Sequence, residues 1–126
     1  MEDCLFCKII KGEIPCHKIY EDENVLAFLD INANPVGHTL VIPKSHYVNI
    51  LDVQESDLIN VICAVKKVAN HYVDNKNANG FNLQVNNGKS AGQEVAHLHF
   101  HILPRGLEGL NNKTLAEVCD VLKIDW

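Results

Sequence analysis

The sequence predicts an α+β fold with an antiparallel sheet of about five strands, one long helix and short helices near both ends of the chain. Short apolar runs of strand length recur between tight polar loops, and one long helical pattern follows the first strands. No repeat, linker or low-complexity tract divides the 126 residues. We therefore expect a single domain over residues 1–126, with its helices on one side of the sheet.

Turn-forming residues divide the first part of the chain into short elements. Gly12 and Pro15 end the first apolar run, Asp22-Glu23-Asn24 has the composition of a hairpin turn, and Pro43 closes an apolar run. The expected elements are a helix at Leu5–Lys11 and strands at Lys18–Glu21, Val25–Asp30 and His38–Ile42.

The longest expected element is an amphipathic helix over Val53–Val73. Asp52, followed three residues later by Glu55, resembles a capping box at its start. Cys63 falls within this helix and is expected in the core. The apolar positions at helical spacing are Leu58, Val61, Ile62, Val65, Val68, Ala69 and Tyr72.

The rest of the chain predicts two more strands and a short helix. The strands are expected at Phe81–Val85 and Ala96–Leu103, on either side of a loop rich in glycine and asparagine, Asn86–Gln93. Thr114 with Glu117 has the spacing of a helix cap.

Composition restricts the class of function. A net charge of −5 argues against broad nucleic-acid binding, and no apolar run approaches the roughly 20 residues that cross a bilayer. The acidic start, Met1-Glu2-Asp3, is unlike a secretory signal, so we expect a cytoplasmic protein without membrane or nucleic-acid partners. Five cysteines, two of them spaced as Cys-x-x-Cys, favour metal binding and free thiols over disulfides.

Three histidines alternate with apolar residues in the last expected strand. Because strand side chains alternate between faces, His97, His99 and His101 share one face, about 6.5–7 Å apart, and one phosphate can bridge them. Neutral imidazole can attack phosphorus, whereas His-x-His on a strand can also hold a catalytic zinc with a third ligand. The residues alone leave both chemistries open. The alternate residues are expected in the core: Leu98, Phe100 and Ile102.

The run His97-Leu98-His99-Phe100-His101-Ile102-Leu103 resembles the signature of the histidine-triad (HIT) superfamily, in which histidines alternate with apolar residues. The resemblance covers Cys4–Arg105 and implies a HIT-like fold. Other segments similar to that family's, in its order, are Phe6-Cys7-Lys8-Ile9-Ile10, Glu13-Ile14-Pro15, Leu26-Ala27-Phe28-Leu29-Asp30-Ile31, Gly37-His38-Thr39-Leu40-Val41-Ile42-Pro43-Lys44 and Gly92-Gln93.

The resemblance implies a nucleotide site. The family's central histidine, which attacks the α-phosphate, matches His99; its phosphate-binding histidine matches His101, and a fourth histidine at the site edge matches His38. Asp30 matches the residue that binds the ribose, although a strand-end turn would also explain it. Ile9, Phe28 and Ile31 are implied to form the apolar slot for the base, and ordinary core packing is their alternative role. The remaining implied nucleotide contacts are Asn86, Gly92, Gln93 and Glu94.

Glu94 departs from the family pattern, in which many members carry serine or threonine that can bond the phosphate. A carboxylate at this position would repel a phosphate unless it points away or meets a positively charged leaving group. The resemblance therefore leaves the preferred leaving group open.

The pair Cys4 and Cys7 has the spacing of a zinc knuckle, although two reduced helix cysteines are the alternative. In the zinc-containing branch of the HIT family, two histidines complete the set, and these match His46 and His97. The resemblance thus implies a closed, structural Cys₂His₂ zinc site, and we expect no organic cofactor.

The implied activity is that of a Hint-like homodimeric enzyme. It would act on purine nucleoside phosphoramidates or aminoacyl-adenylates through a nucleotidyl-histidine intermediate and release AMP. A dinucleoside polyphosphate hydrolase, a non-catalytic purine-nucleotide binding or adaptor protein, and a metal-dependent hydrolase that uses the triad as ligands are the alternatives.

Overall fold

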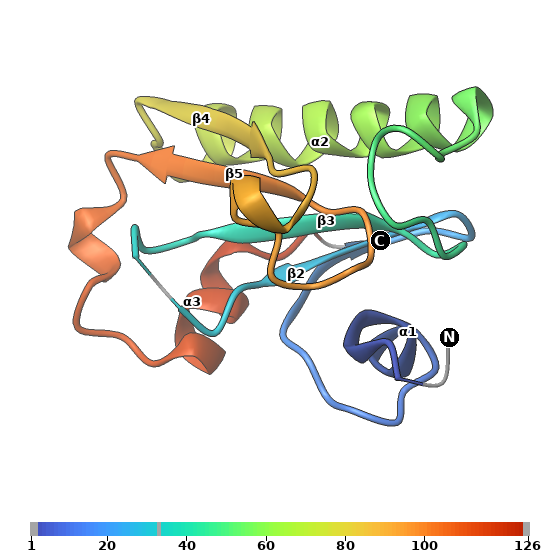
Figure 1. Ribbon diagram of the computed structural model, residues 1–126. Helices are drawn as coiled ribbons and strands as arrows, with labels where there is room; N and C mark the ends of the chain where they lie inside the picture. The colour runs from blue at the N-terminus through green and yellow to red at the C-terminus, as the bar shows by residue number, and fades with distance from the viewer. Residues whose placement is uncertain (1–2, 33, 125–126) are drawn as a thin grey trace.

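The computed structural model describes residues 3–32 and 34–124. The expected domain covers residues 1–126, so residues 1–2, 33 and 125–126 of it lie outside this description. Five antiparallel strands form one sheet in the order β1-β2-β3-β5-β4 (Figure 1). The strands are β1 (Lys18–Glu21), β2 (Val25–Leu29), β3 (Thr39–Pro43), β4 (Gly80–Val85) and β5 (Phe100–Arg105). The helices are α1 (Leu5–Ile10), α2 (Glu55–Lys76), α3 (Leu115–Leu122) and two short 3₁₀ turns, η1 (Lys89–Ala91) and η2 (Glu108–Leu110). The expected α+β fold is confirmed.

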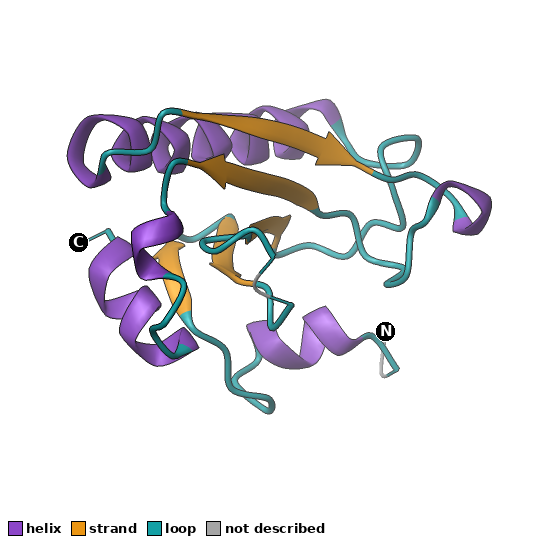
Figure 2. Cartoon of the chain, turned by 90° about the vertical axis from the view of Figure 1, so that its left-hand side faces the viewer, coloured by secondary structure: helices purple, strands orange, loops and turns teal. Residues whose placement is uncertain are grey.

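The two faces of the sheet carry different layers. The main core lies between one face and the helices α2 and α3, and it includes Val41, Val65 and Val118. A smaller cluster packs α1 on the other face through Phe6 and Ile9. Figures 1 and 2 show α1 and α2 on opposite sides of the strands. The expectation that all helices share one side was therefore wrong. The sheet face under α1 is not covered by α2 or α3, and the candidate site lies on this face.

Two expectations about α2 were also wrong. The helix begins after Gln54, which makes no side-chain cap; the Asp52 carboxylate instead accepts the backbone N–H groups of Val48 and Asn49, at 3.0 and 2.9 Å. Cys63 is exposed, because it lies about 200° around the helix from buried Val61. At the other end of the chain, the capping box of Thr114 and Glu117 is confirmed.

The last strand begins later than expected. β5 starts at Phe100, so His97 and His99 precede the paired segment. The Leu98 N–H donates to the carbonyl of Tyr47, in the loop after β3, at 2.7 Å. This N–H is therefore not available to pair with a neighbouring strand. The alternation nevertheless holds: Leu98, Phe100 and Ile102 are buried in the main core.

Strand register carries the site to the face under α1. His101 lies directly across from Leu40, and Leu40 lies directly across from Phe28. Because opposed residues of neighbouring strands share a face, these three side chains form a row under α1. Gly37 precedes this part of β3 with a φ of 87°, and an added Cβ would lie 3.2 Å from Leu107 and Leu122. Close packing therefore favours glycine just before His38.

Candidate active site and metal centre

A pocket of about 780 Å³ lies beside the row under α1. It brings together the end of β2, the start of β3, the histidine segment and the loop that follows β4. Of the eleven residues expected to act on or bind a nucleotide, ten line it: Ile9, Phe28, Asp30, Ile31, His38, Asn86, Gly92, Glu94, His99 and His101. Gln93 does not line the pocket.

His99 is buried and oriented by the backbone. Its Nδ1 lies 2.7 Å from the carbonyl oxygen of His97. Since a carbonyl can only accept, Nδ1 must carry the proton, which leaves the lone pair of a neutral ring on Nε2. Burial lowers the pKa of His99 from its usual value, so the ring is neutral at neutral pH. This arrangement prepares Nε2 as a nucleophile.

His101 and His38 form a pair next to His99. His38 Nε2 lies 2.9 Å from His101 Nδ1, and 3.7 Å from Asp30 Oδ2. Burial, followed by the neighbouring His99 and His38, lowers the pKa of His101 to about 4. The other ring nitrogen of His101, Nε2, is buried without a hydrogen-bond partner. Buried polar atoms are normally paired, so this orphan atom points to a ligand at the pocket.

The loop between β4 and β5 is braced by Gln93. Its side-chain amide donates to the carbonyls of Val48 and Val95, and its Oε1 accepts the Gly88 N–H at 2.8 Å. The Gln93 N–H donates to the Gly88 carbonyl at 3.1 Å. Its side chain therefore fixes the loop internally and to the segment that follows β3, and Gln93 positions Gly92 beside the pocket.

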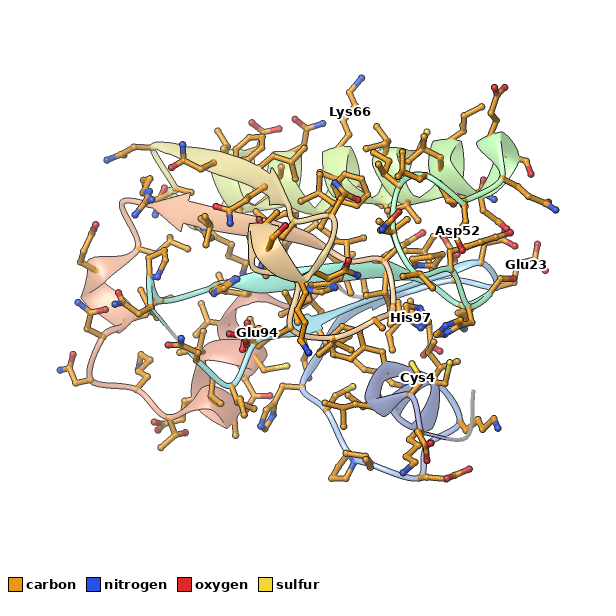
Figure 3. All side chains as sticks on the ribbon, viewed as in Figure 1. Cys4, Glu23, Asp52, Lys66, Glu94 and His97 are labelled. Carbon is orange, nitrogen blue, oxygen red and sulfur yellow. The ribbon has the colours of Figure 1, made fainter. Side chains whose placement is uncertain are left out.

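Four expected metal ligands come together at the other end of the histidine segment. Cys4 Sγ lies 3.3 Å from His97 Nδ1, Cys7 Sγ lies 3.3 Å from His46 Nδ1, and the ligand atoms of all four lie within 4.8 Å of one another. Figure 3 shows Cys4 and His97 next to each other, at the start of α1. Cys4 is also the N-cap of this helix, where its Sγ accepts the Cys7 N–H.

This donor set fits zinc. A tetrahedral zinc ion with ordinary bond lengths separates sulfur and nitrogen ligands by about 3.5 Å, close to the distances observed here. His97 Nε2 lies 2.9 Å from the Pro43 carbonyl and must donate to it, so the Nδ1 lone pair faces the thiols. A carbonyl behind a histidine ligand is the usual outer support of such sites. Burial and the nearby Cys4 raise the pKa of the Cys7 thiol to about 11, and a cation would reverse this effect.

The triad is thus divided between two clusters. His97 joins the cysteines, whereas His101 joins His38 and Asp30. Among the described residues, the candidate metal-binding groups include none that holds all three triad histidines. The geometry therefore favours a nucleophilic role for His99 over a zinc site built from the triad.

Sequence reasoning missed several residues of this region. The Phe6 ring packs edge-on against both His97 and His99, with centroids 5.9 and 5.1 Å away, so α1 contacts the proposed metal ligand and the proposed nucleophile. The segment between α1 and β1 lines the pocket through Ile14, Cys16 and His17. The family-like segment Glu13-Ile14-Pro15 was a signal for this contact, but spacing alone assigned it no role.

The fold and the site define a small α+β domain whose alternating histidines lie between an apolar pocket and a Cys₂His₂ cluster. The family model described as the HIT domain matches residues 11–107. The chain belongs to this family.

Characterised and uncharacterised relatives share most of this chain. An uncharacterized HIT-like protein of Methanocaldococcus jannaschii is 53% identical over 102 residues, which are 81% of this chain and 78% of that protein. The adenosine 5'-monophosphoramidase of Schizosaccharomyces pombe is 42% identical over 102 residues, 81% of this chain and 73% of its own length. An adenylylsulfatase of Arabidopsis thaliana is 46% identical over 103 residues, 82% of this chain but 52% of the plant protein.

Solved structures agree with the fold. A HIT-like protein from Bartonella henselae superposes with a TM-score of 0.87 at 40% identity, covering 98% of this chain and 96% of that one. A zinc-bound histidine triad family protein from Mycobacterium smegmatis has a TM-score of 0.85 at 35% identity, covering 97% and 91% of the two chains.

Proposed function

We propose that this protein is a nucleotide hydrolase that cleaves purine nucleoside 5'-phosphoramidates or aminoacyl-adenylates at the α-phosphate and releases AMP. The observation that carries the proposal is the orientation of His99, whose Nδ1 proton is held by the His97 carbonyl. A relative that is 42% identical is an adenosine 5'-monophosphoramidase, which supports the same chemistry.

The reaction has two steps. In the first, His99 Nε2 forms a bond to phosphorus while the bond to the leaving group breaks, and the leaving atom keeps the electron pair. An amine nitrogen then takes a proton from solvent, whereas an aminoacyl group departs as a carboxylate. In the second, water attacks the phosphorus, His99 Nε2 leaves, and the proton of the water returns to solvent. Imidazole is both a good nucleophile and a good leaving group, so one difficult displacement becomes two easier ones.

The other residues of the pocket bind and orient the substrate. His101 Nε2, the buried atom without a partner, is available to the phosphate. Phe28 and Ile9 are buried and would hold the base by apolar contact, and Asp30 would accept hydrogen bonds from the ribose hydroxyls. Ile31 lines the same pocket but is 86% exposed, so it would cover the base from outside.

Zinc has a structural role in this proposal. Cys4, Cys7, His46 and His97 would hold the ion as a closed set of four ligands, which leaves no position for substrate. The ion would fix the N-terminus of α1 to the segment that precedes β5. These residues position His99 without taking part in the reaction.

Turnover of a fluorogenic adenosine 5'-phosphoramidate tests the proposal. The wild type should release amine and AMP in equal amounts, whereas His99→Ala should lose at least about 10⁴-fold in kcat/KM. Wild-type activity that survives in His99→Ala would contradict the nucleophilic role. Nucleotide binding without any turnover by the wild type would favour a binding or adaptor protein instead.

We also propose that the protein forms a homodimer through α2 and the edge strand β4. Five large apolar side chains on these two elements are exposed: Ile59, Ile62, Val73, Phe81 and Leu83. An unpaired sheet edge beside an apolar surface is a typical site of association. Light scattering should give twice the chain mass for the wild type and a lower mass for Leu83→Lys; a monomeric wild type would contradict the proposal.

A further inference from the structure

Glu94 lies between two neighbouring cavities. Its side chain is exposed and lines the catalytic pocket together with His99. It also lines a smaller cavity of about 480 Å³, which lies beside the cysteine end of α1. Leu5 and Val95 line both spaces as well, so the two cavities meet at these residues. A group that leaves the catalytic pocket on this side passes the Glu94 carboxylate.

The charges around both cavities have one sign. Among the described residues that line them there is no lysine or arginine, whereas Asp3, Asp30 and Glu94 each contribute a carboxylate. The ion pairs among the described residues do not include Glu94, so a neighbouring lysine does not neutralise it. Burial lowers the pKa of His38, which keeps this ring neutral at neutral pH.

Glu94 shares the catalytic pocket with the reacting residue. Glu94 and His99 both line this pocket, so the carboxylate faces the space that the leaving group enters. Asp30, the other carboxylate of the catalytic pocket, is held differently: it follows β2, where its Oδ1 accepts the Asn32 N–H at 2.9 Å. Asp30 and the apolar slot belong to the nucleoside end of the pocket. Glu94 is therefore the carboxylate of the catalytic pocket that is available to the leaving group, and Asp3 lines the smaller cavity alone.

We propose that Glu94 selects substrates by the charge of the leaving group and that the cavity beside it receives that group. Amines carrying a second, positively charged nitrogen are favoured, and anionic leaving groups such as sulfate or a second nucleotide are disfavoured. The inference rests on the proposed hydrolase function and adds the substrate class. It separates this chain from the adenylylsulfatase relative, whose substrate loses an anion.

The selected reaction balances without a further reactant. His99 Nε2 bonds to phosphorus, and the P–N bond breaks with its electron pair on the departing nitrogen, which takes a proton from solvent. The distant ammonium group of the leaving amine keeps its charge throughout. Water then releases AMP and returns one proton. Glu94 neither gives nor takes a proton; its carboxylate attracts the ammonium group.

Three adenosine 5'-phosphoramidates of equal chain length test the proposal. Their amines are 1,2-diaminoethane, propylamine and β-alanine, which place a positive, a neutral or a negative end group in the adjoining cavity. For each substrate, kcat/KM of a variant is divided by kcat/KM of the wild type. Differences in the intrinsic reactivity of the three amines then cancel. Because exposed charge pairs contribute about 0.2–1 kcal/mol, each unit of charge should change kcat/KM by up to about fivefold.

The informative variants are Glu94→Gln, which keeps the shape, and Glu94→Lys, which reverses the charge. Relative to wild type, Glu94→Gln should lower the ratio of kcat/KM for the cationic over the anionic substrate by about tenfold, and Glu94→Lys should lower it further. Glu23→Gln is the matched control, since it removes the same charge from an exposed residue that lines neither cavity and lies far from Glu94 in Figure 3. It should keep the wild-type ratio.

The two possible failures differ. Turnover with a ratio that Glu94→Gln leaves within twofold of wild type overturns the charge selection and leaves the hydrolase function intact. Absence of turnover with all three substrates in the wild type overturns the proposed function and the selection with it. The ratio should also fall with added salt, because small ions screen exposed charges; a ratio insensitive to salt would assign the preference to shape.

Discussion

His97 and His99 are two residues apart, both buried, and present opposite ring nitrogens to their surroundings. The Pro43 carbonyl accepts from His97 Nε2, which turns the Nδ1 lone pair toward the thiols. The His97 carbonyl accepts from His99 Nδ1, which leaves the Nε2 lone pair for the pocket. Two backbone carbonyls therefore turn one lone pair toward the cysteines and the other toward the pocket.

The carbonyl behind each ring, more than the position of the ring in the motif, determines which nitrogen is left to bind a metal or attack a phosphate. Both rings are neutral, because burial lowers the pKa of His97 to about 4 and also lowers that of His99. A neutral imidazole has one donor and one acceptor, so fixing the donor fixes the acceptor. Replacing a residue of the Cys₂His₂ cluster should mainly lower stability, and replacing a histidine of the pocket should mainly lower activity.

The largest expected effect is a loss of stability when one of the four candidate metal ligands is replaced. Cys7→Ser should reduce bound zinc from one ion per chain to a small fraction, measured by elemental analysis. It should lower the free energy of unfolding by about 4 kcal/mol, the contribution of a ligand present at about a thousand times its Kd. Cys63→Ser, at an exposed thiol, is the control and should retain the metal. Full zinc content in Cys7→Ser would show that the cluster is not the binding site.

The next effect is a loss of catalysis when His101, at the pocket end of the histidine segment, is replaced. His101→Asn removes the ring whose buried Nε2 has no hydrogen-bond partner and which we propose binds the phosphate. Loss of one such contact should lower kcat/KM by about 10²–10³-fold while the zinc content stays unchanged. His71→Asn, on α2 outside the pocket, should behave as wild type. Equal activities of His101→Asn and wild type would assign the phosphate to another residue.

A smaller effect is expected where the two regions are linked. Gln93 connects the Val48 carbonyl, just after the candidate metal ligand His46, to Gly88 in the pocket loop. Gln93→Leu keeps the side-chain volume but removes these bonds, so kcat/KM should fall about tenfold through misplacement of the loop, with zinc retained. Unchanged steady-state kinetics in this variant would show that the loop holds its shape without the brace.

A further effect is expected on the pH dependence of stability. His101 has a pKa of about 4 when folded, against about 6.5 in the unfolded chain. Between these values the unfolded state binds more protons, so the free energy of unfolding falls as pH decreases from about 6.5 to about 4. The free energy of unfolding, measured by urea titration at several pH values in this window, should depend on pH more steeply in the wild type than in His101→Asn. The difference in slope should correspond to up to about one proton. Identical slopes would contradict the low pKa.

The alternation of the motif was enough to predict which side chains enter the core. Leu98, Phe100 and Ile102 are buried as expected, because a one-residue shift would place three imidazoles in the main core instead. The division of the triad came from the resemblance, since spacing alone could not distinguish a nucleophile from a zinc ligand. The structure adds the reason, which lies in the carbonyls of Pro43 and His97.

Other features depended on contacts that a sequence pattern does not contain. The late start of β5 results from the Leu98 N–H bonding to Tyr47, far away in the chain. Asp52 has cap spacing but binds the turn that precedes it, because two backbone N–H groups are nearer than the helix start. α1 covers the opposite face of the sheet through Phe6, which a six-residue helix could not indicate by periodicity. The cytoplasmic location stays a prediction; none of the helices in the described part of the chain is long and apolar enough to cross a membrane.

Trapping the covalent intermediate tests the division of the triad most directly. An adenosine 5'-phosphoramidate is mixed with the wild type, the reaction is quenched in alkaline denaturant to protect the P–N bond, and the peptides are analysed by mass spectrometry. We predict an adenylyl group on His99 and none on His97 or His101. An adduct on either of the other two histidines, or turnover with no adduct on any of them, would contradict the account.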